Sequence, residues 1–164
     1  MKTQYLLALS LATLLGGCAM DNPPPQKTSL EIQSFQSRQF ETDKKTAFNS
    51  TMSVFQDLGY IVSSASMETG FIAAESPTKG AQGMAALLEA LSSMRSEGRT
   101  AVTAFVEEIG PKATKVRLNF VQRDKTIMEY GKQANNDKPI MDPKVYEAAF
   151  NKIGDAVFVR SAQK

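Results

Sequence analysis

The chain contains one cysteine, Cys18, and no histidine. A single cysteine cannot close a disulfide within the chain, and histidine is the side chain that most often binds transition metals or transfers protons in catalysis. The folded part must therefore be stabilised by its own hydrophobic core. The composition allows this, because 42% of the 164 residues are hydrophobic and 22% are charged, as in an ordinary globular domain.

The N-terminus has the features of a secretion signal. Lys2 supplies a positive charge, and residues 6–15 (LLALSLATLL) form an apolar run. Such a run fits the hydrophobic region of a signal peptide and is too short to cross a bilayer comfortably as a helix. We therefore expect residues 1–17 to be removed when the protein is exported.

The apolar run ends in Leu15-Gly16-Gly17-Cys18, which resembles the lipobox of bacterial lipoproteins. In that family an aliphatic residue and two small residues precede a cysteine whose thiol receives diacylglycerol. The resemblance implies that Cys18 becomes the lipidated first residue of the mature protein, with acyl chains that contribute about 0.8 kcal/mol per buried methylene. A plain secretory signal followed by an unrelated cysteine is the alternative interpretation.

The residues after Cys18 predict where the protein is held. Residue 19 is alanine, whereas lipoproteins retained at the inner membrane of enteric bacteria carry aspartate there, so the resemblance implies the outer membrane with the domain facing the periplasm. Residues 21–29 (DNPPPQKTS) contain three consecutive prolines, which predicts an extended tether of roughly 3.1 Å per residue. The expected organisation is a signal peptide (1–17), a lipidated N-terminus with a tether (18–29) and one domain (30–164).

Local patterns along that domain predict strands and helices. Thr42 or Asp43 can cap a helix that Gly59 ends in a left-handed conformation, and Asp142-Pro143 is a start signal for a last helix. A polar stretch, residues 131–138, precedes this last helix. The predicted strands are residues 33–40, 60–62, 70–74, 100–106 and 115–121. The predicted buried positions are Phe48, Met52, Phe55 and Leu58 in the first helix and Tyr146, Ala149, Phe150, Ile153 and Val157 in the last.

The predicted order is β-α-β-β, an inserted helix within residues 79–98, and then β-β-α. Strands linked by hairpins pair antiparallel, and each predicted helix has one apolar stripe. The sequence therefore predicts an α+β domain in which an antiparallel sheet of about four to five strands carries its helices on one face.

Residues 47–74 resemble a pattern found in small envelope lipoproteins, including the repeated domains of BamC in the β-barrel assembly machinery. In FQDLGY (55–60) a helix closes with a glycine and an aromatic residue, and in IVSSASMETGFIAA (61–74) a second strand begins near a glycine. The resemblance covers about thirty residues and a compatible final helix, and this chain has one such domain where BamC has two. It implies a place in the envelope and no particular activity.

Two surfaces are candidates for contact with a partner. An apolar stripe in the helix predicted within residues 79–98 suits a partner helix or a membrane, although core packing is the usual role of such a stripe. The polar side of the strand at residues 115–123 is an open face or edge that can receive a partner, although a solvated face is the ordinary interpretation. The candidate residues are Met84, Leu87, Leu88, Leu91 and Met94 in the helix and Lys115 and Arg117 in the strand.

Net charge and the side chains present narrow the range of functions that we expect. Without Lys2, 18 basic side chains face 17 acidic ones, so there is no basic field to favour nucleic acid. No catalytic constellation, metal-ligand spacing or cofactor motif stands out, so we expect a protein that is not an enzyme. We expect a lipoprotein that works by protein contact, as an accessory or scaffold subunit of an envelope assembly or transport complex. A module that binds a small ligand or cell-wall glycan is the second hypothesis, and the oligomeric state stays open.

Overall fold

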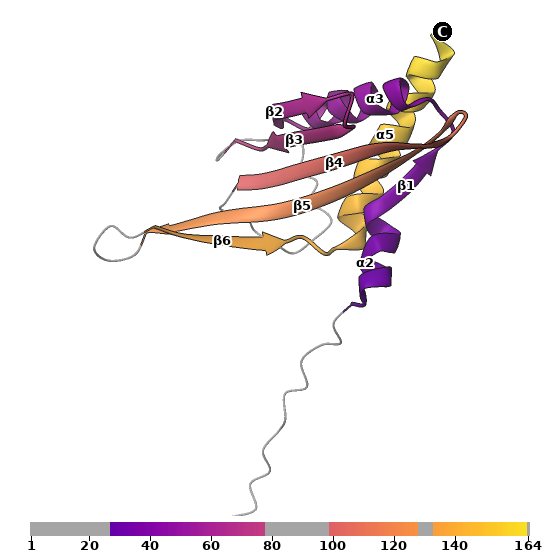
Figure 1. Ribbon diagram of the computed structural model, residues 1–164. Coiled ribbons are helices and arrows are strands. Elements are labelled where there is room, and N and C mark those ends of the chain that lie inside the picture. The colour runs from indigo at the N-terminus through magenta and orange to yellow at the C-terminus, as the bar shows by residue number, and fades with distance from the viewer. Residues whose placement is uncertain (1–26, 78–98, 128–132, 164) are drawn as a thin grey trace, which may run out of the picture.

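The computed structural model describes residues 27–77, 99–127 and 133–163. These residues form an α+β domain with a six-stranded antiparallel sheet, as Figure 1 shows, and the predicted fold class is confirmed. The helices are α2 (Ser29–Gln36), α3 (Lys44–Asp57) and α5 (Pro143–Ala162). The strands are β1 (Ser37–Phe40), β2 (Ile61–Ser66), β3 (Phe71–Glu75), β4 (Arg99–Gly110), β5 (Ala113–Ile127) and β6 (Gln133–Pro139).

The long strand β5 organises the sheet. The strand order is β1-β5-β4-β3-β2, and β6 also pairs with β5. On the side away from β4, β5 pairs with β1 from Thr114 to Arg117 and with β6 from Val121 to Ile127. The outer part of β5 and β6 extends as a two-stranded ribbon past the helices (Figure 1). Every described pairing is antiparallel, as expected for strands joined by hairpins.

The helices α3 and α5 begin where the sequence signals lie, and α3 also ends at its predicted stop. The Asp43 carboxylate accepts a hydrogen bond from the Thr46 amide at 2.8 Å, and the Asp142 carboxylate accepts one from the Lys144 amide at 3.0 Å. Gly59 has φ 80°, and the Tyr60 amide donates to the Phe55 carbonyl at 2.9 Å. This bond is typical of a helix closed by a left-handed glycine, so both predicted caps and the predicted stop are confirmed.

The core lies between α3 and α5 and the sheet face that they cover. The ring centroids of Phe120 on β5 and Tyr146 on α5 are 5.2 Å apart in an edge-to-face arrangement. All the predicted buried positions are buried except Met52, which is partly buried. The largest fully buried side chains include Phe55, Ile72, Val102, Leu118, Phe120, Tyr146, Phe150 and Ile153. These buried side chains belong to one hydrophobic cluster.

The segment predicted as the first strand begins as a helix. Residues 33–36 belong to α2, and only Ser37–Phe40 is a strand. A capping box starts this helix: the Thr28 hydroxyl accepts from the Glu31 amide at 3.3 Å, while the Glu31 carboxylate accepts from the Thr28 amide at 2.6 Å. These bonds satisfy amides that a helix start otherwise leaves unpaired. The Thr28 amide and hydroxyl both donate to the Glu31 carboxylate, and these two bonds lower the pKa of Glu31.

The polar stretch before α5 contains a sixth strand, one more than predicted. β6 pairs with β5 from Gln133 to Pro139, and its residues 136–139 are exposed. Over residues 136–139 this strand is therefore held by backbone pairing with β5 and not by burial of side chains. A strand of this kind carries no apolar alternation in its sequence.

Several predictions fall outside the described residues. They concern the signal peptide, the lipobox residues Leu15, Gly16, Gly17 and Cys18, most of the tether, and the apolar stripe Met84, Leu87, Leu88, Leu91 and Met94. Among the helices that are described, none is both long and apolar enough to cross a bilayer.

Candidate functional site

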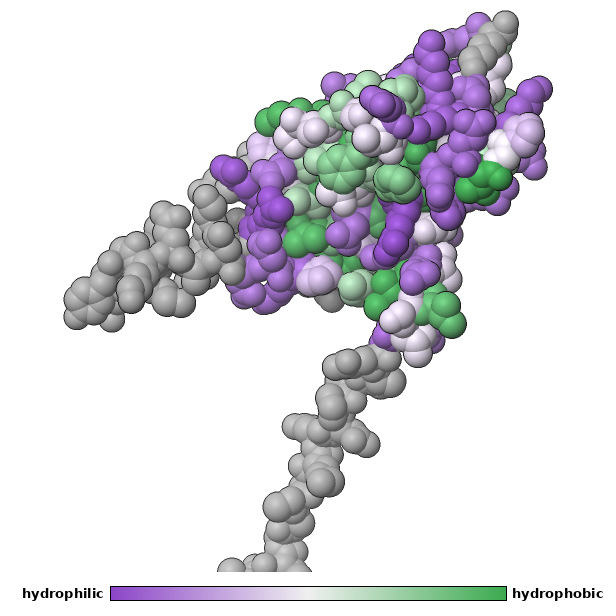
Figure 2. All heavy atoms as spheres, in the orientation of Figure 1, coloured by the Kyte–Doolittle hydropathy of each residue, from purple (hydrophilic) through white to green (hydrophobic). Residues whose placement is uncertain are grey.

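The two faces of the sheet differ in what covers them. In Figure 1, α3 and α5 lie behind the sheet, and the strands themselves face the viewer. We call the side opposite α3 and α5 the open face. Figure 2 shows the same side with hydrophobic residues gathered in its middle and hydrophilic residues around them. A half-exposed sheet normally turns polar side chains to water, so the exposure of apolar side chains on this face requires an explanation.

Two aromatic side chains lie at the centre of the open face. Phe71 on β3 is 40% exposed and Phe105 on β4 is 45% exposed. Phe71 pairs with Phe105, and Phe105 pairs with Arg117 on β5, so the three residues stand in one row across three strands. Directly opposite residues have Cβ atoms about 5 Å apart, so their side chains form a continuous surface.

Gly70 fixes the position of Phe71. It has φ 77°, its amide donates to the Ser66 carbonyl at 2.8 Å, and its carbonyl accepts from the Val106 amide at 2.8 Å. A Cβ atom at this position would lie 2.1 Å from the Val106 carbonyl oxygen. Only glycine allows both this conformation and this close approach, which sets the turn before β3 directly against β4.

Ion pairs occupy both ends of the open face. At one end, the Lys115 ammonium lies 2.9 Å from the Glu107 carboxylate. At the other end, Arg123 pairs with Glu75 and lies 3.7 Å from the Asp137 carboxylate. Exposed pairs of this kind contribute only about 0–1 kcal/mol to stability. Their main consequence is that these charges already have partners of opposite sign.

Arg117 lies between these ion pairs and has a neutral partner. Its guanidinium donates to the Gln36 side-chain carbonyl at 3.5 Å, and among the described residues no carboxylate lies within ion-pair distance of it. The Gln36 amide donates to the Tyr146 hydroxyl at 3.4 Å, which donates to the Ile140 carbonyl at 2.8 Å. Burial raises the pKa of Tyr146, so its hydroxyl keeps the proton that it donates. A chain of hydrogen bonds thus leads from the core to Arg117.

A groove of about 420 Å³ runs along this part of the open face. Phe71, Phe105 and Arg117 line it from the sheet, and Ile32 and Gln36 line it from α2. Thr103 and Asn119 add small polar groups. The groove therefore combines two aromatic rings with one cation, an arrangement that suits an apolar side chain next to an acidic one.

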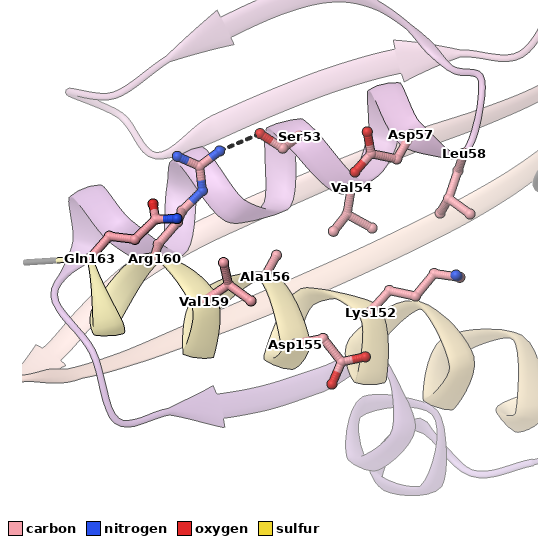
Figure 3. Close-up of a pocket in the computed structure, with 10 residues that line it drawn as sticks. All are labelled: Ser53, Val54, Asp57, Leu58, Lys152, Asp155, Ala156, Val159, Arg160 and Gln163. Carbon is pink, nitrogen blue, oxygen red and sulfur yellow. Dashed lines mark hydrogen bonds between the residues drawn. The ribbon is translucent and has the colours of Figure 1, made fainter.

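A second groove, of about 520 Å³, separates α3 from α5 (Figure 3). Val54, Leu58, Ala156 and Val159 form its apolar part, and the Arg160 guanidinium donates to the Ser53 hydroxyl at 2.6 Å. The remaining charged residues along it are Asp57, Lys152 and Asp155, so basic and acidic groups alternate. Mixed charges and the lack of an aromatic ring make this groove a weaker recognition surface than the open face.

The structure places the predicted strand residues but also adds to them. Lys115 and Arg117 lie two residues apart on β5 and therefore share the open face. β5 is paired on both sides there, so they lie on a sheet face and not at an edge. Phe71 and Phe105 were not predicted as site residues. The signal in the sequence is an aromatic residue in the polar register of an alternating strand, since Phe105 alternates with the buried Ala104 and Val106.

The described residues contain no group of three or more acidic or cysteine side chains able to hold a metal ion. In comparisons with known proteins, no family model and no curated protein matches this chain. The function is therefore inferred from the residues and their geometry.

Proposed function

We propose that this chain is a lipid-anchored envelope protein that acts without catalysis, by binding another envelope protein through the open face of its sheet. The observation that carries this proposal is the exposure of Phe71 and Phe105, at 40% and 45%, in the middle of that face. Aromatic residues are enriched at protein interfaces, where they supply most of the binding energy. Their ion-paired surroundings give the patch a polar rim, as in a typical interface core.

The lipid anchor proposed at Cys18 indicates where in the envelope the domain meets its partner. The proline-rich composition predicts that an extended tether between Cys18 and Lys27 would span roughly 30 Å, at about 3.1 Å per residue. The Lys27 ammonium donates to the Met141 carbonyl at 2.6 Å and lies 5.0 Å from the centre of the Phe35 ring. These contacts attach the end of the tether beside α2, which also lines the groove. The partner is therefore expected close to the outer membrane, as an accessory or scaffold contact in an envelope complex.

The anchor is tested by changing Cys18 to serine in the full-length protein. We expect the variant to leave the membrane fraction, because a hydroxyl does not receive the diacylglycerol group. Fractionation of cells, with mass spectrometry of the mature N-terminal peptide, measures this. A variant that is processed normally and stays with the outer membrane would contradict the anchor.

The partner surface is tested by crosslinking and purification of the lipidated protein from membranes. The double variant Phe71→Ser/Phe105→Ser is expected to lose a stoichiometric envelope partner that the original chain retains. Phe158→Ser is the matched control, because Phe158 on α5 is 75% exposed but lies away from the sheet. Loss of the partner with the control and not with the double variant would contradict the proposal.

A second candidate function is the binding of a small ligand or glycan in the groove between α3 and α5. The observation in its favour is the volume of about 520 Å³, within the range of ligand sites. Titration of the protein with soluble cell-wall glycan fragments, followed by NMR, distinguishes the two functions. Saturable shifts at Val159 and Arg160 would favour the second function, and unchanged spectra would exclude this ligand class.

A further inference from the structure

We propose that the partner binds the groove with a segment in which an acidic side chain lies next to a large apolar side chain. The carboxylate pairs with Arg117, and the apolar side chain covers Phe71 and Phe105. This inference rests on the proposed function and adds the chemistry of the segment that is recognised.

The first argument is the distribution of charge on the open face. Lys115 and Arg123 each have a carboxylate partner within the domain, whereas Arg117 is hydrogen-bonded to the neutral amide of Gln36. A partner that covers Phe105 also covers Arg117, which stands opposite it. A cation that loses its water without gaining an anion is strongly destabilising. The covering segment must therefore bring a carboxylate, which guanidinium binds with two parallel hydrogen bonds.

The second argument is the fixed position of the groove's parts. Gln36 is buried and is held by Tyr146, so the acceptor that holds Arg117 does not move freely. Gly70 holds the turn before Phe71 against β4. Groups that are positioned before binding lose little conformational entropy when the partner arrives. The backbone that carries Phe71 and the buried acceptor of Arg117 are thus in place before the partner binds.

Other occupants fit the same charges less well. In a contact between two copies of the chain, the described carboxylates Glu75 and Glu107 of this face are already paired within each copy, so neither is left over for Arg117 of the other copy. An anionic lipid surface is usually recognised by clusters of about four to eight basic residues, and here one cation stands between internal ion pairs. A protein segment with an apolar side chain and a carboxylate can cover the two rings and pair with Arg117.

The test uses the full-length lipidated protein, immobilised in detergent, and a library of random linear peptides displayed on phage. We expect the enriched peptides to carry Asp or Glu within one or two residues of Leu, Ile or Phe. Arg117→Glu replaces the cation with an anion that repels the acidic side chain, so it should weaken binding of these peptides about tenfold or more. A tenfold change corresponds to about 1.4 kcal/mol. Arg117→Lys should bind with intermediate affinity, and Phe158→Ser should bind as the original chain does.

Three results would overturn the inference: no enriched peptides, enriched peptides without acidic residues, or equal binding by Arg117→Glu. The membrane purification separates this failure from failure of the proposed function. If Phe71→Ser/Phe105→Ser loses the envelope partner and Arg117→Glu keeps it, the open face is the interface but the acidic segment is wrong. If both variants keep the partner, both proposals fail. Circular dichroism on each variant confirms that the fold is retained.

Discussion

The two faces of the sheet are made by alternate residues of the same strands, yet they have different roles. On β4, Ala104 and Val106 point into the core, and Phe105 between them is half exposed. On β5, Leu118 and Phe120 are fully buried, while Arg117 and Asn119 face outward. The covered face forms the core, and the open face presents aromatic side chains that are only partly buried. Substitutions at neighbouring positions should therefore separate stability from binding.

The largest expected effect is on the covered face. Phe120→Ala removes a fully buried ring and should lower the free energy of unfolding by about 3–5 kcal/mol. Phe105→Ala makes the same chemical change on the open face and should cost about 1 kcal/mol or less, as most exposed substitutions do. Denaturation in urea measures both values. Equal losses for the two variants would show that the open face is part of the core.

The next effect concerns the turn that positions Phe71. Gly70→Ala should cost about 2 kcal/mol or more, because φ 77° is unfavourable for alanine and its Cβ would meet the Val106 carbonyl oxygen. Gly154→Ala is the control, since its Cβ would lie 3.6 Å from Phe40 in ordinary contact and alanine favours a helix by about 1 kcal/mol. Thermal unfolding of the two variants measures the contrast. A Gly70→Ala protein as stable as the original would disprove the close approach.

A smaller effect on stability is expected from substitutions of two buried tyrosines, whose hydroxyl groups differ in their hydrogen bonds. The Tyr146 hydroxyl bonds to the Ile140 carbonyl and to Gln36, whereas the Tyr60 hydroxyl has no hydrogen-bond partner among the described residues. Tyr146→Phe should cost about 1–2 kcal/mol and Tyr60→Phe should be neutral or slightly stabilising, because an unpaired buried polar group is itself unfavourable. Urea denaturation measures both. If Tyr60→Phe were the more destabilising, the hydrogen-bond chain from Tyr146 toward the open face would lose its support.

The smallest effect appears only at alkaline pH. Burial raises the pKa of Tyr60 and of Tyr146 above the ordinary value of 10.0. Above that pH the unfolded chain loses phenolic protons that the folded chain still holds, so the free energy of unfolding should fall as the pH rises past about 10. With no histidine in the chain, stability should be almost constant between about pH 6 and 9. Tyr60→Phe should reduce the alkaline slope, and an unchanged slope would contradict the assignment.

The sequence predicts most of the helix and strand order because strong local signals mark it. Asp43, Gly59 and Asp142 bound α3 and α5, and apolar periodicity identifies their buried sides. The strand predicted from residue 33 overlaps the end of α2, and the sequence signal for this helix lies upstream, in the capping-box spacing of Thr28 and Glu31. β6 has no such signal, since it pairs with β5 and its described side chains, at residues 136–139, are exposed.

The candidate site is less predictable because it depends on which strands become neighbours. Alternation in β5 placed Lys115 and Arg117 on a polar side, but only the pairing of β3, β4 and β5 brings Phe71, Phe105 and Arg117 into one row. Pairing between strands distant in sequence is not encoded in any single window. The role of the apolar stripe from Met84 to Met94 stays a prediction.

The most direct test of the account is photocrosslinking from single positions in the full-length protein in living cells. A photoreactive amino acid in place of Thr103, beside the two open-face rings, should attach to one defined envelope protein on irradiation. The same amino acid in place of Phe158 on α5 should not attach to that protein. Attachment from position 158 together with none from position 103 would show that the molecule binds through its helices, and that the open face is not its working surface.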